Sequence, residues 1–478
     1  MNKDLVINTN LGDISGVTKD RVNSFLGIPY SSGLGIENRF CPAEPIEPWD
    51  GLLDATNIGP IPPQRPSRLS RVMGDFNLPY NEDCLTLNIW AHNGNTKNLP
   101  VIFWIHGGAF VSGSGSLDWY KGESFARDQE IILVGINYRL GALGFLCHPD
   151  ISIGNLGIQD QILALEWVNR NISFFGGDPA NITIMGQSAG AISAFALLAN
   201  NKARHLIKNV IFQSGRFNSF ETSDIASEKA EKFAKLAGLK IKKLATMPLE
   251  RLLDAQSALA QKEAIFASTN IPFLPVIDGE IIPKNTRSAA IEGAINKNIM
   301  LGSTHDEMHA FISGTPEIET ASDKQIEEVF RREFKDSWKA IYEDCLKKVP
   351  GATPMEILSL GLNIAHFEGQ TSELAVDFAR KRINTWLYRF DWKNHASPFG
   401  ACHCIELPFL FNTYKNWRPP MISGLDLNEG AKLSKVLQNT WAAFARHGDP
   451  NHKDIPFWPK FSTKDRSKIH WNLPIKLT

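Results

Sequence analysis

A serine between two glycines stands where an apolar run gives way to a helical stretch. Positions 186–190 read G-Q-S-A-G, directly after I-T-I-M at 182–185. Gly186 and Gly190 allow a tight strand-to-helix turn that pushes the hydroxyl of Ser188 outward. The first amides of the following helix point at any negative charge that develops beside that hydroxyl. This context predicts a nucleophile, and a simple turn serine is the alternative.

A second glycine-rich turn, H-G-G-A-F at 106–110, also follows an apolar run. Such a turn presents free backbone N–H groups to one point, as a tetrahedral oxyanion requires. We expect the amides of Gly108, Ala109 and Ala189 to be the donors, while Gly107 permits the backbone path. A flexible glycine loop is the alternative, but it leaves the pairing of the two turns unexplained.

Apolar runs alternating with helical stretches must position these turns. Continuous apolar strands separated by helices indicate an α/β fold with a mainly parallel central sheet flanked by helices. Short runs before residue 30 predict an antiparallel edge at the N-terminus. The central runs are at 85–90, 101–105, 131–136, 182–185, 210–212, 299–301 and 386–390, the N-terminal ones are at 5–8, 13–17 and 22–28, and helices are expected at 159–171 and 428–447.

The 478 residues are expected to form one elaborated domain, 1–478, because large α/β folds often run this long as a single unit. Within it, about 219–363 is rich in helical patterns and is expected to supply inserted, lid-like or regulatory helical lobes over the active site. A long loop, 42–81, is expected to border that site.

Further motifs are distributed over nearly the whole chain. Together with the two turns, they resemble the pattern of the type-B carboxylesterase family. That family contains the cholinesterases and the bacterial para-nitrobenzyl esterases, and the resemblance is to the latter in motif pattern. It implies the α/β-hydrolase fold and serine-dependent ester hydrolysis. The motifs are E-D-C-L-T-L-N-I-W at 82–90, N-Y-R-L-G-A-L-G-F-L at 137–146, G-N-L-G-I-Q-D-Q at 154–161, F-F-G-G-D-P-A-N-I-T at 174–183, F-Q-S-G at 212–215, P-V-I-D-G at 275–279 and G-A-C-H-C-I-E-L-P-F-L-F at 400–411.

The same resemblance implies the partners of the serine. It places the acid at Glu307, in H-D-E-M, and the base at His403, in C-H-C-I-E-L-P. The order Ser188, Glu307, His403 is the nucleophile, acid, base order of α/β-hydrolases, and each residue follows a predicted strand.

Neighbouring polar residues offer other interpretations. Asp306 is an alternative acid, although consecutive side chains at a strand end point apart. His305 and His309 are expected to be packing or loop histidines, and His106 to shape the glycine turn through a hydrogen bond. Ser214 is expected to support Glu307 or the backbone near it.

The chain departs from the family pattern at several positions. Pro62 replaces a cysteine usual there, which leaves Cys84 without its familiar disulfide partner. Gln187 stands where many relatives have glutamate, which removes a negative charge beside the serine, and Met308 stands where glycine is usual.

Composition excludes several classes of partner. With 50 basic and 51 acidic residues and no dense basic block, the chain is not expected to bind nucleic acid. Neither a signal peptide nor a membrane-spanning stretch is recognised, and the scattered cysteines suit a reducing compartment, so we expect a cytoplasmic protein. Cys402 and Cys404 flank His403 but lack the second half of a zinc site, so no metal or cofactor is expected.

These residues predict a serine carboxylesterase that works through an acyl-enzyme, as a monomer or small homo-oligomer. Only Phe76 and Tyr80 are aromatic in 62–81, where choline-binding relatives use tryptophan. We therefore expect uncharged short- to medium-chain or aryl esters, bound by the 62–81 loop, Phe110, 305–315 and 350–365. An acyltransferase or lactone-forming enzyme with the same triad is the alternative, followed by a catalytically silent interaction protein.

Overall fold

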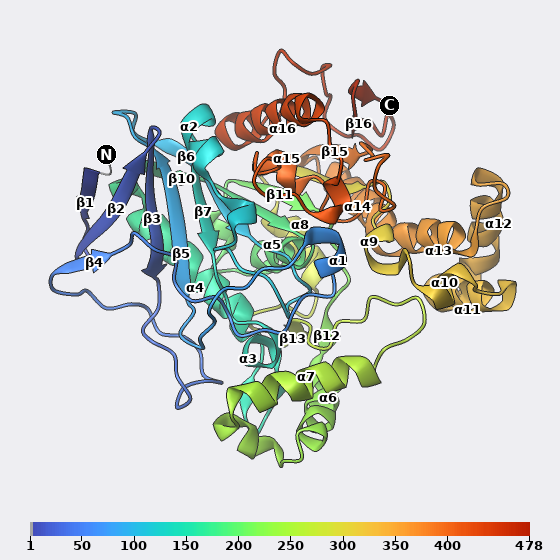
Figure 1. Cartoon of the computed structure of the whole chain (residues 1–478), viewed down its shortest axis with the longest axis horizontal. Helices are drawn as coiled ribbons and strands as arrows, with labels where there is room; N and C mark the ends of the chain where they lie inside the picture. The colour runs from blue at the N-terminus through green and yellow to red at the C-terminus, as the bar shows by residue number, and fades with distance from the viewer. Residues whose placement is uncertain (1–2) are drawn as a thin grey trace.

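The computed structural model describes residues 3–478, and one 13-stranded sheet forms its centre (Figure 1). The strands run in the order β1-β2-β3-β5-β7-β6-β10-β11-β14-β15-β16-β17, and β4 pairs with β2. All neighbours from β7 to β16 in this order are parallel. The strands are β1 Lys3–Asn8, β2 Asp13–Lys19, β3 Val22–Pro29, β4 Leu52–Asp54, β5 Thr86–His92, β6 Leu99–Ile105, β7 Ile132–Ile136, β10 Gly177–Gln187, β11 Asn209–Gln213, β14 Asn298–Thr304, β15 Asn384–Phe390, β16 Lys468–Trp471 and β17 Lys476–Leu477.

Antiparallel pairing is confined to the two edges of the sheet. β1, β2, β3, β5 and β7 pair antiparallel in succession, and β17 pairs antiparallel with β16. The expected mainly parallel sheet with an N-terminal antiparallel edge is therefore confirmed.

Central strands contain continuous apolar runs, which agrees with helices that cover both of their faces. In β6, Phe103 belongs to the hydrophobic core on one face, whereas Ile102 and Trp104 belong to the core on the other. Successive side chains of a strand point to opposite faces, so a strand buried on both sides reads as a continuous apolar run.

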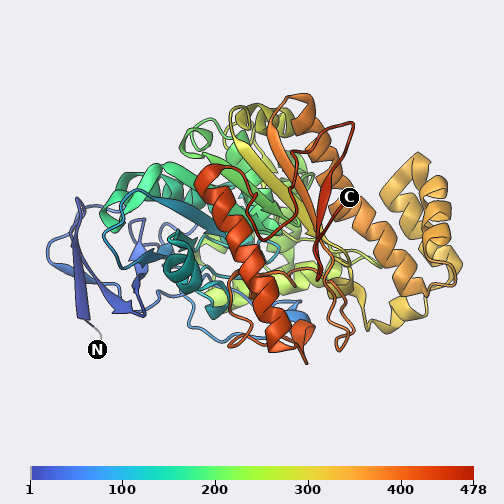
Figure 2. The same ribbon diagram turned by 90° about the horizontal axis from the view of Figure 1, so that it is seen from above.

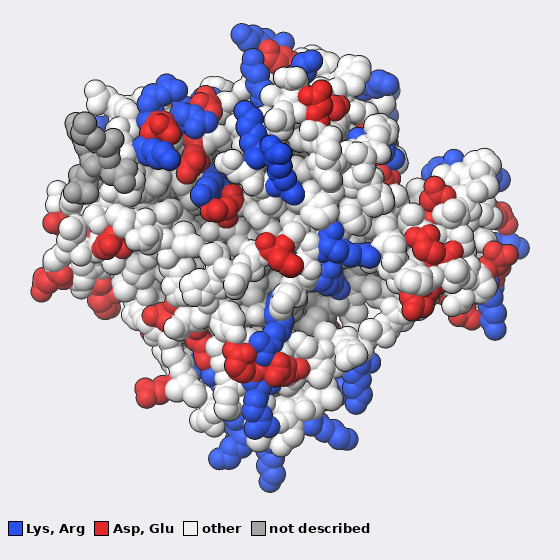
Figure 3. Space-filling model, in the orientation of Figure 1, with Lys and Arg blue, Asp and Glu red and all other residues white. Residues whose placement is uncertain are grey.

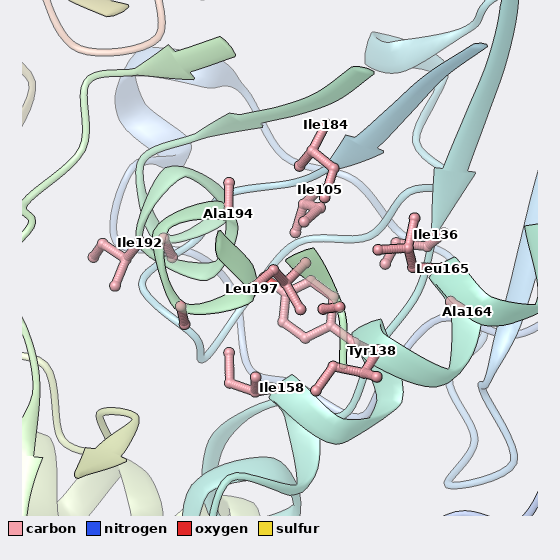
Figure 4. Close-up of a cluster of buried hydrophobic side chains, with 14 of the residues drawn as sticks. Ile105, Ile136, Tyr138, Ile158, Ala164, Leu165, Ile184, Ile192, Ala194 and Leu197 are labelled. Carbon is pink, nitrogen blue, oxygen red and sulfur yellow. The ribbon is translucent and has the colours of Figure 1, made fainter. Parts of the chain in front are cut away.

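The two faces are covered by different helices (Figures 1 and 2). Helices α4, α5 and α14 contribute to the first core, part of which is shown in Figure 4, and α2 and α16 contribute to the second. The longer helices are α2 Glu123–Gln129, α4 Leu156–Asn171, α5 Ala189–Ala199, α6 Ser223–Leu236, α7 Leu249–Lys262, α8 Thr286–Gly293, α11 Asp323–Phe334, α12 Trp338–Lys348, α13 Pro354–Asn363, α14 Gly369–Arg380 and α16 Leu427–His447. The short ones are α1 Ser70–Met73, α3 Gly141–Phe145, α9 His309–Ile312, α10 Pro316–Glu319 and α15 Leu407–Leu410.

The helix-rich region about 219–363 supplies two separate helical groups, interrupted by β14. Helices α6 and α7 form one group, and α10 to α13 form a lobe that projects to one side of the sheet (Figure 1). The lobe has its own apolar core, which includes Ile326, Phe330, Leu358 and Leu362. Its own core lets the lobe stand apart from the sheet; its regulatory or lid-like action stays a prediction.

Within residues 3–478, no helix combines the length and apolar character needed to cross a membrane.

Candidate active site

Ser188 occupies a sharp turn between β10 and α5. Its backbone is in an unusual conformation, with φ 56° and ψ −122°, and its amide donates to the carbonyl of Gln213 over 2.8 Å. A Cβ on Gly186 would lie 2.2 Å from the carbonyl oxygen of Gly190, and one on Gly190 would lie 2.0 Å from that of Ile105. Only glycine fits at either place, so the two glycines of the motif are a steric requirement of the turn.

His403 is hydrogen-bonded to Glu307, and both side chains are almost completely buried. Nδ1 of the imidazole bonds one carboxylate oxygen of Glu307. The other carboxylate oxygen accepts the backbone N–H of Thr304, at the end of β14, over 2.7 Å. These two contacts fix the carboxylate and orient the imidazole, as the histidine of a serine nucleophile requires.

Asp306 points away from the imidazole. Its carboxylate accepts the N–H of Ala401 over 2.9 Å and bonds His305 over 2.5 Å, and it forms an ion pair with Lys393. These hydrogen bonds, together with nearby positive charge, outweigh burial and hold the pKa of Asp306 below its usual range. The structure thus brings Glu307, and not the alternative acid, to His403.

The glycine turn after β6 lies directly against the serine. A Cβ on Gly107 would come within 3.0 Å of the Cβ of Ser188, and one on Gly108 would lie 1.9 Å from the carbonyl oxygen of Ser112. Ala109 has a positive φ of 54°. Among residues 3–478, the amides of Gly108, Ala109 and Ala189 donate no hydrogen bond, so all three remain available to an oxyanion.

His106 shapes this turn as expected. Its Nδ1 bonds the carbonyl of Gly107 over 2.7 Å, and its ring stacks on Tyr138, whose hydroxyl donates to the carbonyl of His106. Burial lowers the pKa of His106 to about 4, so the ring is neutral at physiological pH.

Gln187 contacts His403 directly, which the sequence analysis did not anticipate. Its Nε2 lies 3.1 Å from Nε2 of His403. Among the described residues, no hydrogen bond joins Ser188 to His403, although both border the same cavity. Ser214 also borders the cavity and ties β11 to β14 through its amide, 2.8 Å from the carbonyl of Gly302, but no hydrogen bond joins its side chain to Glu307 in this part of the chain.

A second carboxyl group, Glu406, is buried near the pair. One of its oxygens accepts from Nε2 of Gln213 over 3.1 Å, and the other has no partner among the described residues. Burial, reinforced by the negative charge of Glu307, raises the pKa of Glu406 to about 8. Sequence patterns gave no signal for this group, because a carboxyl in an E-L-P segment carries no mark of its burial.

Ser188 and His403 border a single large cavity of about 1320 Å³, including its opening to solvent. The 62–81 loop contributes to its walls as expected, and so does Phe311. The expectation for Phe110 was wrong, because that ring packs on Phe145, 4.8 Å away between centroids. The expectation for 350–365 was also wrong: no residue of this range lines the cavity, whereas Phe367, just beyond it, does. Lining residues outside the predicted regions include Trp119, Tyr120, Phe367, Thr269, Asn270, Ile271 and Arg216.

The cysteines beside the imidazole are buried thiols. All six cysteines are free, and burial raises the pKa of both Cys402 and Cys404 above the usual range. No group of three or more histidine, cysteine, aspartate or glutamate side chains within residues 3–478 is arranged to hold a metal ion.

Known proteins with similar sequences and structures are esterases and related hydrolases. The para-nitrobenzyl esterase of Bacillus subtilis (strain 168) is 34% identical over 477 residues, covering 97% of this chain and 94% of its own. The probable N-octanoylanthranilate hydrolase AqdA2 of Rhodococcus erythropolis is 35% identical over 469 residues, covering 95% of each chain. Among solved structures, the Geobacillus stearothermophilus carboxylesterase EST55 superposes with a TM-score of 0.89 at 31% identity, covering 99% of this chain and 97% of its own.

The family model described as the carboxylesterase family matches residues 3–476, nearly the whole chain. Its α/β-hydrolase fold and its esterase relatives agree with this match. The protein therefore belongs to the carboxylesterase family and is a carboxylic-ester hydrolase.

Proposed function

We propose that Ser188, His403 and Glu307 are the catalytic triad of this serine carboxylesterase. The observation that carries the proposal is that Ser188, on its sharp turn, borders the same cavity as His403, whose other ring nitrogen is held by Glu307. In the cycle, Nε2 of His403 takes the proton of Ser188 as its oxygen attacks the ester carbonyl. Glu307 keeps the imidazole oriented and stabilises its positive form.

The amides of Gly108, Ala109 and Ala189 hold the oxyanion that forms on the carbonyl oxygen. Collapse of this intermediate breaks the bond to the alcohol, which leaves with the proton from His403. Water then attacks the acyl-enzyme by the same route and releases the acid. Two of these three donors belong to a turn held by backbone contacts, so they are positioned before substrate binds.

The substrates we propose are aryl esters and short- to medium-chain esters. The support is a cavity lined by apolar and aromatic side chains next to the serine, such as Leu69, Met73, Trp119 and Phe311. Burial of an acyl chain or an aromatic ring against such a wall contributes roughly 25 cal/mol per Å².

The test is hydrolysis of para-nitrophenyl acetate, butyrate and octanoate by the wild type and by Ser188→Ala, with intact-mass detection of acylated protein. We expect an acyl adduct on the wild type only and a rate for the variant near that of the buffer. Equal rates for both proteins would overturn the assignment of the nucleophile.

We further propose that the enzyme works in the cytoplasm as a monomer or small homo-oligomer and binds no nucleic acid. The free thiols support a reducing compartment. Basic and acidic side chains are interspersed on the face shown in Figure 3, which supports the absence of a phosphate-binding surface there. Cell fractionation and light scattering test the location and the assembly state.

A further inference from the structure

Two arginines line the cavity beside the proposed nucleophile. Arg68 lies just before α1, and Arg216 follows β11 two residues after Ser214. Both border the cavity that Ser188 and His403 also border. Arginine is the side chain best suited to bind a carboxylate, because its planar guanidinium donates two parallel hydrogen bonds.

Neither guanidinium is neutralised by a carboxylate. The Nη atoms of Arg68 donate to the carbonyls of Asn270, over 3.2 Å, and Thr269, over 3.5 Å. Arg216 donates from Nη1 to the hydroxyl of Thr269 over 2.6 Å, and its Nε is buried without a partner. Among residues 3–478, no carboxylate oxygen lies within 4.0 Å, the limit for an ion pair, of a guanidinium nitrogen of Arg68 or Arg216.

The surroundings of the two arginines differ. Arg216 is half-buried, and removal of water by the surrounding atoms lowers its pKa to about 10, a value that already includes the opposing effects of Glu333, which raises it, and Arg68, which lowers it. Arg68 is an exposed residue, although nearby atoms displace enough water to lower its pKa to about 10 as well. The unpaired charge of Arg216 is therefore unfavourable, and a ligand that pairs it removes this penalty, while Arg68 adds a second positive charge beside it.

Neighbouring charged groups are already paired. Arg65, in the same loop as Arg68 and also at the cavity, bonds Glu250 over 2.7 Å and Asp254 over 2.6 Å. Glu333 is the acidic group whose charge acts on Arg216, but its carboxylate bonds Arg332 over 2.8 Å.

His366 also lies near Arg216 and Glu333, and it adds no charge to the cavity. Its Nε2 lies 3.4 Å from Glu333, and burial, with the charges of Arg216 and Arg332, lowers its pKa to about 2. The positive charge left over in the cavity therefore belongs to Arg68 and Arg216.

Arg68 stands at a distance from His403 that a small substrate spans. The guanidinium carbon of Arg68 lies 5.4 Å from the centre of the Phe311 ring, and that ring lies 5.2 Å from the imidazole of His403. One aromatic ring thus separates the guanidinium from the base. A substrate whose ester carbonyl meets Ser188 reaches this charge with a short chain or a single ring.

Resting on the proposed esterase function, we infer that Arg68 and Arg216 bind a carboxylate carried by the substrate, so that the enzyme prefers esters of anionic molecules over their neutral counterparts. This carboxylate stands either on the acyl chain or on the alcohol. The uncharged esters expected from the sequence remain substrates, because the apolar wall and the triad do not depend on the two arginines, but they are not the preferred ones.

The test compares three benzyl-type esters whose alcohol products are separated by chromatography. Benzyl hexanoate is neutral, monobenzyl adipate carries a carboxylate on the acyl chain, and meta-carboxybenzyl hexanoate carries one on the alcohol. We expect wild-type kcat/KM to be at least tenfold higher for one of the two anionic esters than for benzyl hexanoate, and the better one tells which side faces the arginines.

Substitution of the arginines should remove this preference. In Arg68→Gln, Arg216→Gln and the double variant, kcat/KM for the preferred anionic ester should fall tenfold or more, mainly through KM, while that for benzyl hexanoate stays within a few fold. Arg68→Lys should restore part of the preference, because it retains the charge. Arg71→Gln is the matched control, since Arg71 lies three residues after Arg68, is exposed and does not line the cavity.

Two results would overturn the inference. In the first, the arginine variants lose kcat/KM equally for neutral and anionic esters, which indicates that the arginines only hold the loop at Thr269 and Asn270. In the second, the wild type has a lower kcat/KM for both anionic esters than for benzyl hexanoate. Calorimetry of the same three esters with Ser188→Ala separates binding from catalysis. If a folded wild type hydrolyses none of the esters, the proposed function fails, and the calorimetry still decides the arginine site. The arginine site is supported if an anionic ester binds more tightly than the neutral one and this difference is lost in the arginine variants. Equal binding of all three esters refutes it.

Discussion

Gln187 Nε2 lies 3.1 Å from Nε2 of His403, the ring nitrogen that we propose accepts the proton of Ser188. An amide N–H at this position donates to an unprotonated Nε2, which agrees with an Nδ1–H that donates to Glu307. Both contacts fit the imidazole tautomer that the proposed general base requires. In the proposed mechanism, Nε2 of His403 exchanges its contact with Gln187 for a hydrogen bond to Ser188 before attack. Catalytic hydrogen bonds often form or shorten only when substrate binds.

Replacing this amide by a carboxylate should shift the pH dependence of the reaction. In Gln187→Glu, a negative charge beside His403 favours the imidazolium, so deprotonation of the base requires a higher pH. We expect the acidic limb of the kcat/KM profile to move upward by about one pH unit, with little change at high pH.

Gln187→Leu is the comparison, because it removes the hydrogen bond without adding charge. Its acidic limb should stay near that of the wild type. A Gln187→Glu profile that superposes on the wild-type profile would show that the side chain at this position leaves His403 once substrate binds.

Glu307 and Asp306 are adjacent in sequence, and their variants should behave very differently. Glu307→Gln replaces one carboxylate oxygen by an NH2 donor, so the side chain can no longer accept from both the N–H of Thr304 and Nδ1–H of His403. The corresponding change in a comparable triad costs about four orders of magnitude in kcat, because the imidazole is then held in the wrong tautomer. Asp306→Asn should retain most activity, because its carboxylate faces Ala401, His305 and Lys393. Steady-state kinetics on both variants, with circular dichroism to verify folding, would reverse the assignment if Asp306→Asn were the inactive one.

The fold was predictable from sequence because its strands are buried on both faces. Such strands read as continuous apolar runs, and the predicted run at 101–105 lies within β6. Boundaries were less predictable: β10 begins at Gly177, ahead of its apolar run at 182–185, because D-P-A-N at its start carries no strand pattern. Turns with positive φ, such as that at Ser188, were predictable because glycine neighbours mark them.

The cavity was less predictable than the turns, because its walls come from residues far apart in the chain. Trp119 lines it while stacked on Trp417, at 4.5 Å between ring centroids, and no local pattern links the two. Arg68 and Arg216 are ordinary loop arginines in sequence. Only their joint position in the cavity, without carboxylate partners, distinguishes them from Arg65.

Gly108→Ala should impair both folding and catalysis. The added Cβ would lie 1.9 Å from the carbonyl oxygen of Ser112, and the φ of Gly108 is +114°. The turn must move, and since the loss of one oxyanion donor costs about 10² to 10³ in kcat, we expect at least that loss.

Gly51→Ala is the control: its φ is +87°, but a Cβ there meets nothing within 4 Å. It should cost about 1 kcal/mol of stability and leave kcat unchanged. Wild-type kcat in Gly108→Ala would contradict the proposed oxyanion site.

Glu406 should make the stability of the protein depend on pH in the neutral range. Burial and the charge of Glu307 raise its pKa in the folded state from 4.5 to about 8. Below the unfolded value the group is protonated in both states, so its burial carries no penalty from charge. As pH rises toward 8, the unfolded chain releases the proton while the folded chain retains it, and the free energy of unfolding falls.

Urea denaturation from pH 5 to pH 9 measures this effect. Glu406→Gln keeps an acceptor for Nε2 of Gln213 but cannot ionise, so its free energy of unfolding should fall less over this range than that of the wild type. Glu317→Gln, a matching change at an exposed position, should follow the wild-type curve. Parallel curves for the wild type and Glu406→Gln would mean that the buried carboxyl has the same affinity for its proton in the folded and unfolded chains.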